Sequence, residues 1–240
     1  DTPDGFVVTE FLPDVPWAGK HNTISCAAGH HLYEGRWLRD LRYLDDYSRF
    51  WFGKGGEPRR YSFWAADAVW ARALADGRTG LAKELLPGLI ANYRAWEQSR
   101  LDRIGAYGLF WQIDDRDGME VSIGGSGYRA TINSYLYGDA QAIAAIAELA
   151  GKRQVASEFR RTAAALCDLT LRTLWDEQAR FFKVGRRTAQ PAKSGGILEW
   201  KVNGDPALTR QARPSASHCN AADSVAALND GREPRGSGDH

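Results

Sequence analysis

The sequence predicts an all-α fold built from helical hairpins. Apolar residues recur at helical spacing in several long segments, and one hairpin-sized unit occurs twice along the chain. Alternation of the kind that strands show is confined to residues 5–12 and 106–113. The expected helices cover residues 31–52, 62–76, 79–98, 132–150 and 153–175.

The N-terminal residues 1–30 are expected to form loops and short extended pieces. Pro3, Pro13 and Pro16 would interrupt any helix in this segment, and several glycines add further breaks. Helical structure is therefore expected to begin near residue 31.

An internal repeat defines the hairpin unit. Ser62–Ala68 matches Ser134–Ala140 at its serine, aromatic, small-residue, aspartate and alanine positions. Each copy opens an expected helix, and each is followed by a glycine-containing turn, at Gly77 or Gly151, and a second helix. Repeated hairpins bury their apolar stripes against neighbouring hairpins, so they either stack in a line or close into a ring around a shared cavity.

The second copy carries the clearest helical stripe, and the pattern stops after residue 184. The apolar stripe of residues 132–150 consists of Leu136, Ala140, Ile143 and Ala147. Residues 185–240 are rich in Ala, Ser, Arg, Gly, Asp and Pro and lack this periodicity. We therefore expect one helical domain over residues 1–184, and an irregular or anomalous tail over 185–240; a genuine extension is the alternative.

Composition narrows the class of function. A chain of 240 residues with 43% apolar residues can bury a substantial core. A net charge of +1 provides no basic field for nucleic acid, and no uninterrupted apolar run is long enough to span a membrane. Three scattered cysteines do not make a disulfide framework. Because Met119 is the only methionine, we expect the natural N-terminus and any signal peptide to lie upstream.

A glycine-rich segment at residues 111–129 combines carboxylates, arginines and aromatic rings. Sugars present hydroxyl groups that suit charged partners and C–H faces that suit flat rings, so this mixture indicates a carbohydrate site. A second group of charged residues surrounds Trp37. Such a group suits recognition of sugar hydroxyl groups, but it suits a structural ion-pair network equally well. The expected sugar-binding residues are Trp37, Arg39, Asp40, Trp64, Asp67, Trp111, Tyr128, Arg129 and Asn133.

Glu120 is the favoured general acid. It lies between Met119 and Val121, and partial burial of a carboxyl among such neighbours would raise its pKa toward neutrality. Asp117 is the second candidate. The competing interpretation is that Asp114, Asp115 and Asp117 form a solvated turn paired with Arg116.

No cofactor or metal is expected. His30 and His31 lie near Cys26 and Glu34, but their spacing matches no zinc motif. A hydrolase that uses a metal at His30 and His31 remains a rival hypothesis, and a chelator would test it. Asp115-Arg-Asp117-Gly118 imitates part of a calcium loop, but Ile113 stands where the loop needs its first acid and Gly124 where it needs its final glutamate.

Three segments, His30–Asp40, Arg60–Asp67 and Asp115–Tyr135, resemble the mannosylglycerate-hydrolase-like glycoside hydrolases. These enzymes are six-hairpin glycosidases with relatives in glycoside hydrolase family sixty-three. The resemblance covers about residues 1–184 and implies the N-terminal part of an (α/α)6 toroid, a ring of helical hairpins. It also favours a periplasmic or extracellular location, since many members of the family act on external glycans.

The resemblance also implies an inverting hydrolysis with one carboxylic acid and one carboxylate base. Glu120 falls where relatives carry the acid of a Gly-Met-Asp-like motif, so its implied role is to protonate the leaving oxygen. The base of the family lies in the second half of the ring, and this chain loses the family pattern before that point. We therefore expect a glycosidase whose 240-residue form is inactive or severely impaired. The alternative is a non-catalytic carbohydrate-binding or helical-repeat interaction protein.

Overall fold

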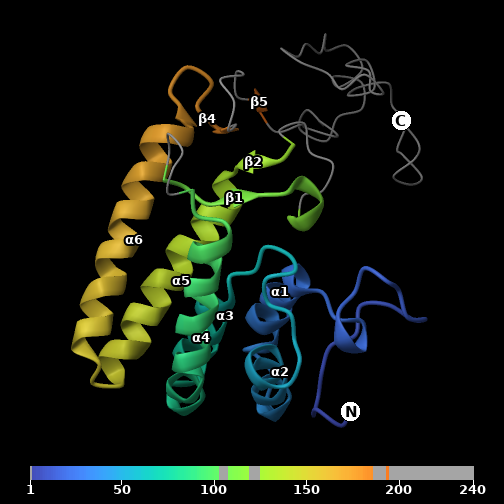
Figure 1. Ribbon diagram of the computed structural model, residues 1–240. Helices are drawn as coiled ribbons and strands as arrows, with labels where there is room; N and C mark the ends of the chain where they lie inside the picture. Colours follow the sequence, from blue (N-terminus) through green and yellow to red (C-terminus); the bar gives the residue numbers. More distant parts are fainter. Residues whose placement is uncertain (1, 103–107, 119–124, 186–192, 195–240) are drawn as a thin grey trace, which may run out of the picture.

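The computed structural model describes residues 2–102, 108–118, 125–185 and 193–194 (Figure 1). Within these residues the fold is all-α, as predicted, with short strands only. The helices are α1 (Ser25–Gly35), α2 (Arg42–Gly53), α3 (Ala65–Asp76), α4 (Gly80–Ser99), α5 (Ala130–Leu149) and α6 (Arg153–Leu174), with 3-10 turns η1 (Lys20–Asn22) and η2 (Asp114–Arg116). The strands are β1 (Trp111–Gln112), β2 (Gly127–Tyr128), β3 (Trp175–Asp176), β4 (Phe181–Val184) and β5 (Lys193–Ser194).

The helices form successive hairpins α1–α2, α3–α4 and α5–α6, which lie side by side (Figure 1). The first helices of the hairpins pack against one another in the order α1, α3, α5, while α2 packs against α4. The repeat seen in the sequence is therefore a repeat of hairpins. Its two glycines, Gly77 and Gly151, both have φ +72°, a left-handed conformation that suits glycine at a helix end.

The prediction of one helix over residues 31–52 is wrong, because the chain turns between α1 and α2. Helix α1 begins at Ser25, inside the segment expected to be irregular, and ends at Gly35. A Cβ on Gly35 would lie 2.6 Å from Leu44 Cδ2, so this glycine allows α2 to pack closely. The carboxylate of Asp40 then accepts the N–H of Arg42 at 3.1 Å as α2 starts. The apolar pattern continued through the turn because both helices face one core.

The other expected helices correspond to α3, α4, α5 and α6. Residues 5–12 are described and form no strand, contrary to the prediction. The N–H of Phe6 donates to the Asp46 carboxylate rather than to a neighbouring strand. Of the strand expected at 106–113, the described part contains only β1. Phe6, Val7 and Val8 instead join an apolar cluster with residues of α1 and α2.

Two apolar clusters hold the described residues together. The larger joins α3 to α6 and includes the fully buried Trp96 and Phe159, together with the whole predicted stripe of α5. The smaller joins α1, α2 and the start of α3 around Phe50 and Phe63. None of the described helices has the length and apolar character needed to cross a membrane.

A short ribbon connects α4 to α5 and organises the loop that was singled out in the sequence. Strands β1 and β2 pair antiparallel, with Trp111 opposite Tyr128. Gln112 extends from β1, and its amide donates to Ser62 Oγ at 2.9 Å, just before α3. The carbonyl of Arg116 accepts the N–H of Ser62 at 2.9 Å. The loop after β1 is therefore fixed to the entry of α3.

Candidate functional site

Trp64 is the point at which α1, α3 and α5 meet. It directly precedes α3, and its ring centroid lies 4.8 Å from His30, 6.2 Å from Tyr33 and 4.6 Å from Tyr135. A Cβ on Gly29 would lie 2.4 Å from Trp64 Cε2, so the glycine allows the indole to pack on the backbone of α1. The result is an aromatic surface contributed by three helices.

Asp67 is a partly exposed carboxylate on the first turn of α3, close to this surface. The hydroxyl of Tyr33 donates to Asp67 Oδ2. Burial, followed by the hydrogen bond to Asp67, raises the pKa of Tyr33 above its ordinary value, so this phenol remains protonated. The pair offers a carboxylate oxygen and a phenol to a ligand hydroxyl group.

Asp117 is fully buried, which contradicts its interpretation as part of a solvated turn paired with Arg116. Arg129 Nε lies 3.2 Å from Asp117 Oδ2, and Arg129 Nη1 lies 2.7 Å from Asp114 Oδ1. Thr131 Oγ1 also donates to Asp117 Oδ2 at 2.6 Å. A buried carboxylate is stable only with such partners, and Arg129 returns to it from the start of α5.

The charge of the buried Asp117 carboxylate affects the pKa of Tyr135, one of the rings of the aromatic surface. Burial first, and then the negative charge of Asp117, raise the pKa of Tyr135. Tyr135 in turn packs on Trp64. We call Tyr33, Trp64, Asp67, Asp117 and Tyr135 the inner-face cluster. It combines flat rings with one partly exposed carboxylate, Asp67, a combination that suits a sugar.

Asp139 supports the inner-face cluster from α5. Its Oδ1 accepts the N–H of Ala66 at 2.9 Å and the N–H of Asp67 at 3.0 Å. Burial is the main cause that raises the pKa of Asp139 to about 8, and its bonds to backbone N–H groups oppose that shift.

Some expected sugar contacts lie below the surface. Tyr128 is 1% exposed, and its hydroxyl donates to Asp102. Asn133 is 0% exposed, and its amide group bonds both the N–H and the carbonyl of Phe110 at 2.9 Å. Trp111 is partly buried against the larger core cluster. Direct sugar contact by these residues stays a prediction, and the burial of Tyr128 and Asn133 favours a positioning role for both.

Trp37 lies at the edge of the site and is 68% exposed. The guanidinium of Arg36 links it to the inner-face cluster, with Cζ 5.0 Å from the Trp37 ring and 4.6 Å from the Tyr33 ring. Trp37 is therefore available to a ligand that extends from Tyr33 toward the loop between α1 and α2.

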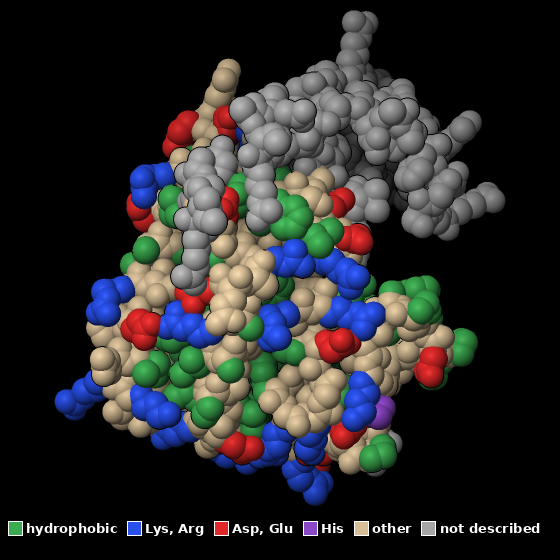
Figure 2. All heavy atoms as spheres, viewed as in Figure 1, with side chains coloured by type: hydrophobic (Ala, Val, Ile, Leu, Met, Phe, Trp, Pro, Cys, Tyr) green, Lys and Arg blue, Asp and Glu red, His purple; other side chains and the backbone are tan. Residues whose placement is uncertain are grey.

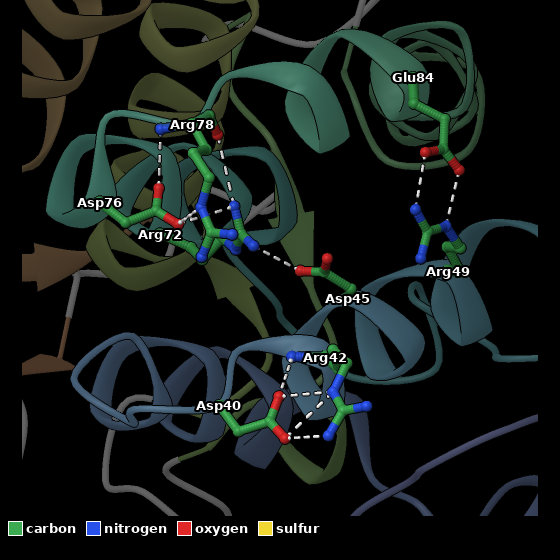
Figure 3. Close-up of polar contacts among 8 residues, drawn as sticks. All are labelled: Asp40, Arg42, Asp45, Arg49, Arg72, Asp76, Arg78 and Glu84. Atoms are coloured by element: carbon green, nitrogen blue, oxygen red, sulfur yellow. Dashed lines mark hydrogen bonds and ion pairs between the residues drawn. The ribbon is translucent and has the colours of Figure 1, made fainter.

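Arg39 and Asp40 lie in the same loop, and the exposed Arg39 stays a predicted sugar contact. Asp40 accepts hydrogen bonds from the Arg42 guanidinium (Figure 3). The hydrogen bonds from Arg42 lower the pKa of Asp40 to about 2. Asp40 has a local structural partner, as the ion-pair interpretation of these charges expected.

Neighbouring charges also pair among themselves. A hollow of about 400 Å³ at this end of α2 is lined by Phe6, Arg42, Tyr43, Asp45, Asp46 and Arg49. Arg49 bonds both oxygens of Glu84, and the buried Arg72 bonds Asp45 (Figure 3). Figure 2 shows basic and acidic side chains interspersed over the viewed face. We therefore assign this charged hollow to structural ion pairs.

Glu120, the favoured general acid, lies outside the described residues. The histidines proposed for the rival metal site have other contacts: His30 packs edge-on against Trp64, and His31 Nε2 lies 3.0 Å from Glu10. Among the described residues, no three His, Cys, Asp or Glu side chains are grouped so that they could hold a metal ion.

Sequence reasoning missed Tyr33, Tyr135 and Asp139 as parts of the site. Tyr33 lies within the first family-like segment, and Tyr135 and Asp139 lie within the internal repeat. Their places in these sequence patterns could be identified, but their contacts with α3 depend on which helices pack together.

Comparisons with known proteins agree with this arrangement. The family model described as the mannosylglycerate hydrolase MGH1-like glycoside hydrolase domain matches residues 20–223. A solved structure titled "Sialidase" is 38% identical with a TM-score of 0.72, over 78% of this chain and 18% of that chain. The chain thus spans less than a fifth of that protein. No curated protein matches. The family match extends past residue 184, and the expected domain boundary there stays a prediction.

Proposed function

The chain belongs to the mannosylglycerate hydrolase MGH1-like glycoside hydrolase domain family, and from this premise we propose that it hydrolyses O-glycosidic bonds of a carbohydrate substrate. The inner-face cluster carries the proposal. It places two aromatic rings, Trp64 and Tyr135, in contact, with the Asp67 carboxylate on the next helical turn and the loop that leads to Glu120 held nearby.

The site residues have two kinds of proposed role. Trp64 and Tyr135 pack on the C–H face of a sugar ring, while Asp67 and Tyr33 bond its hydroxyl groups. Trp37 and the charged loop around it extend the site outward. The remaining expected contacts, Trp111, Tyr128, Arg129 and Asn133, hold the loop and the start of α5 in place, as their burial and bonds support.

The proposed reaction is an inverting hydrolysis. Glu120 donates a proton to the leaving glycosidic oxygen as its bond to the anomeric carbon breaks. A carboxylate base removes a proton from water while the water oxygen attacks the opposite face of that carbon. The two carboxyl groups must lie about 6.5–9.5 Å apart to admit the water. Asp117, the second candidate acid, is committed to Arg129 and Thr131, which supports a positioning role for it instead.

We place the base outside residues 1–184, in a further part of an (α/α)6 toroid. The inner row of α1, α3 and α5 and the outer contact of α2 with α4 support an arc of hairpins. The small share of the sialidase chain that is matched supports a larger catalytic unit. The 240-residue chain alone is then proposed to be inactive or strongly impaired.

The test is release of the aryl group from a panel of α- and β-aryl glycosides. It compares this chain with a longer protein that includes neighbouring coding sequence, each with Glu120 intact and as Glu120→Gln. Glu177→Gln, in the exposed turn after β3, is the matched control. Turnover by the longer protein that is lost in Glu120→Gln and kept in Glu177→Gln supports the proposal. Turnover by the 240-residue chain would place the base within it. Sugar binding without turnover in any form would favour the non-catalytic alternative.

A further inference from the structure

Helix α3 begins without a capping side chain of its own. The first N–H groups of a helix lack partners within the helix, and Ser, Thr, Asp or Asn at the N-cap normally accepts from one of them. The N-cap of α3 is Trp64, which makes no side-chain cap hydrogen bond. An indole has no acceptor for backbone N–H groups, so the first turn of α3 requires an acceptor from elsewhere.

Asp139 supplies that acceptor from the neighbouring hairpin. It lies in the middle of α5, is 1% exposed, and bonds the N–H groups of Ala66 and Asp67 through one oxygen. The cap therefore acts across the contact between α3 and α5.

This cap lies directly beside two residues of the inner-face cluster. One of the two N–H groups belongs to Asp67 itself, and the other belongs to Ala66, two residues after Trp64. On α5, a Cβ added to Gly138 would lie 3.5 Å from Asp67 Cγ, so the two helices are in close contact here. The Asp139 carboxyl group therefore lies at the contact between the first turn of α3 and α5.

We propose that Asp139 is a positioning residue of the sugar site, which caps α3 from α5 and thereby holds Trp64 and Asp67 in their binding orientation. The cap across helices leaves position 64 free to carry an aromatic ring where a helix would otherwise favour a small polar residue. The inference rests on the proposed function for its sugar-binding consequence, but the orientation of Trp64 is testable without a sugar.

The internal repeat shows how one sequence position acquires two roles. Asp67 and Asp139 occupy the same place in the two copies. Asp67 is partly exposed and accepts a hydrogen bond from Tyr33, whereas Asp139 is buried and accepts the backbone N–H groups of Ala66 and Asp67. The aspartate of the second repeat, Asp139, therefore bonds the backbone of the aspartate of the first repeat, Asp67.

The test compares Asp139→Asn, which keeps an oxygen acceptor, with Asp139→Ala and Asp139→Ser, which cannot reach α3. Thr170→Ala is the control for general destabilisation, because the Thr170 hydroxyl is buried and bonds only the carbonyl of Leu166 in its own helix, at 2.7 Å. All variants are labelled with 5-fluorotryptophan, and the fluorine resonance of Trp64 is assigned from its loss in Trp64→Phe.

The expected result is that the Trp64 resonance shifts or broadens in Asp139→Ala, or in Asp139→Ser if the alanine variant does not fold, and stays unchanged in Asp139→Asn and Thr170→Ala. Affinity for methyl α-mannoside and methyl α-glucoside, measured by calorimetry on the longer protein, should fall roughly 10- to 100-fold in the shifted variant, because small displacements of binding groups are costly. Asp139→Asn should retain the wild-type affinity.

The proposal is overturned if Trp64 gives an unchanged resonance in the shortened variants, or if Asp139→Asn or Thr170→Ala shifts it equally. Loss of binding in the Thr170→Ala control to the same extent would also overturn it. If the wild-type protein binds no glycoside of the wider panel while the Trp64 resonance responds as expected, the proposed function fails and the capping role stands.

Discussion

Arg129 is buried and bridges two carboxylates, so its removal should be costly. Its side chain is 5% exposed and pairs with Asp114 and with Asp117, whose side chain is 1% exposed. Arg129→Met keeps an unbranched stem of similar reach but removes the charge and the N–H donors. The variant leaves Asp117 as a buried carboxylate without its cation.

The magnitude follows from the burial of this pair. Removal of one member of a buried ion pair costs about 3–5 kcal/mol, since the remaining charge has lost its compensation. For a chain of this size, each kcal/mol corresponds to roughly 2–4 °C in Tm. The expected decrease in Tm is therefore roughly 6–20 °C. The loss of about 3–5 kcal/mol is a large part of the free energy of unfolding of an ordinary domain, about 5–15 kcal/mol.

The assay is urea unfolding followed by circular dichroism at the helical band, with the free energy of unfolding extrapolated to water. Arg172→Met is the matched control, because Arg172 is 67% exposed in its pair with Asp168 and should change stability by less than about 1 kcal/mol. The double variant Arg129→Met with Asp117→Asn should recover part of the loss. A free energy for Arg129→Met within about 1 kcal/mol of the wild type would refute the buried-pair reasoning.

Two further predictions test the helix contacts. Gly29→Ala should lower the free energy of unfolding by about 1–3 kcal/mol through overpacking, because its Cβ would lie 2.4 Å from Trp64. Gly53→Ala, where no atom lies within 4 Å, should not, and equal losses in chemical denaturation would contradict this. Burial raises the pKa of Asp139 to about 8 in the folded chain, from its ordinary value of 3.8. Between these two values the folded chain holds a proton that the unfolded chain has released, so Asp139 makes the free energy of unfolding fall as the pH rises from about 4 to 8. Asp139→Asn should remove that fall between pH 5 and pH 8, and an unchanged slope would show that Asp139 does not cause it.

Local patterns predicted most of the helices, because apolar residues at helical spacing are the ones that pack in the core. The stripe of α5 through Leu136 and Ile143 is fully buried, as its spacing indicated. The break between α1 and α2 was missed because Leu32 and Leu44 face the same core cluster on both sides of it. Apolar periodicity alone cannot distinguish one long helix from two that share a core.

The site was predictable only in part, since its contacts join distant segments. Trp64 was selected for its neighbours in sequence, but its contacts with α1 and α5 follow from helix pairing. Asp117 was expected to be either a second candidate acid or part of a solvated turn, and its burial depends on Arg129 returning from the start of α5. Asp139 resembled an ordinary repeat position, and its cap on α3 becomes evident only when the two helices are in contact.

The most direct test of the proposed sugar site is a crystal structure of the longer protein as Glu120→Gln, with the glycoside that the wild-type protein hydrolyses fastest. We expect a sugar ring packed on Trp64 and Tyr135, a sugar hydroxyl bonded to Asp67, and the glycosidic oxygen within hydrogen-bond reach of side chain 120, about 2.6–3.2 Å. A sugar bound elsewhere, with the inner-face cluster unoccupied, would contradict the assignment of this surface as the site of a glycoside hydrolase.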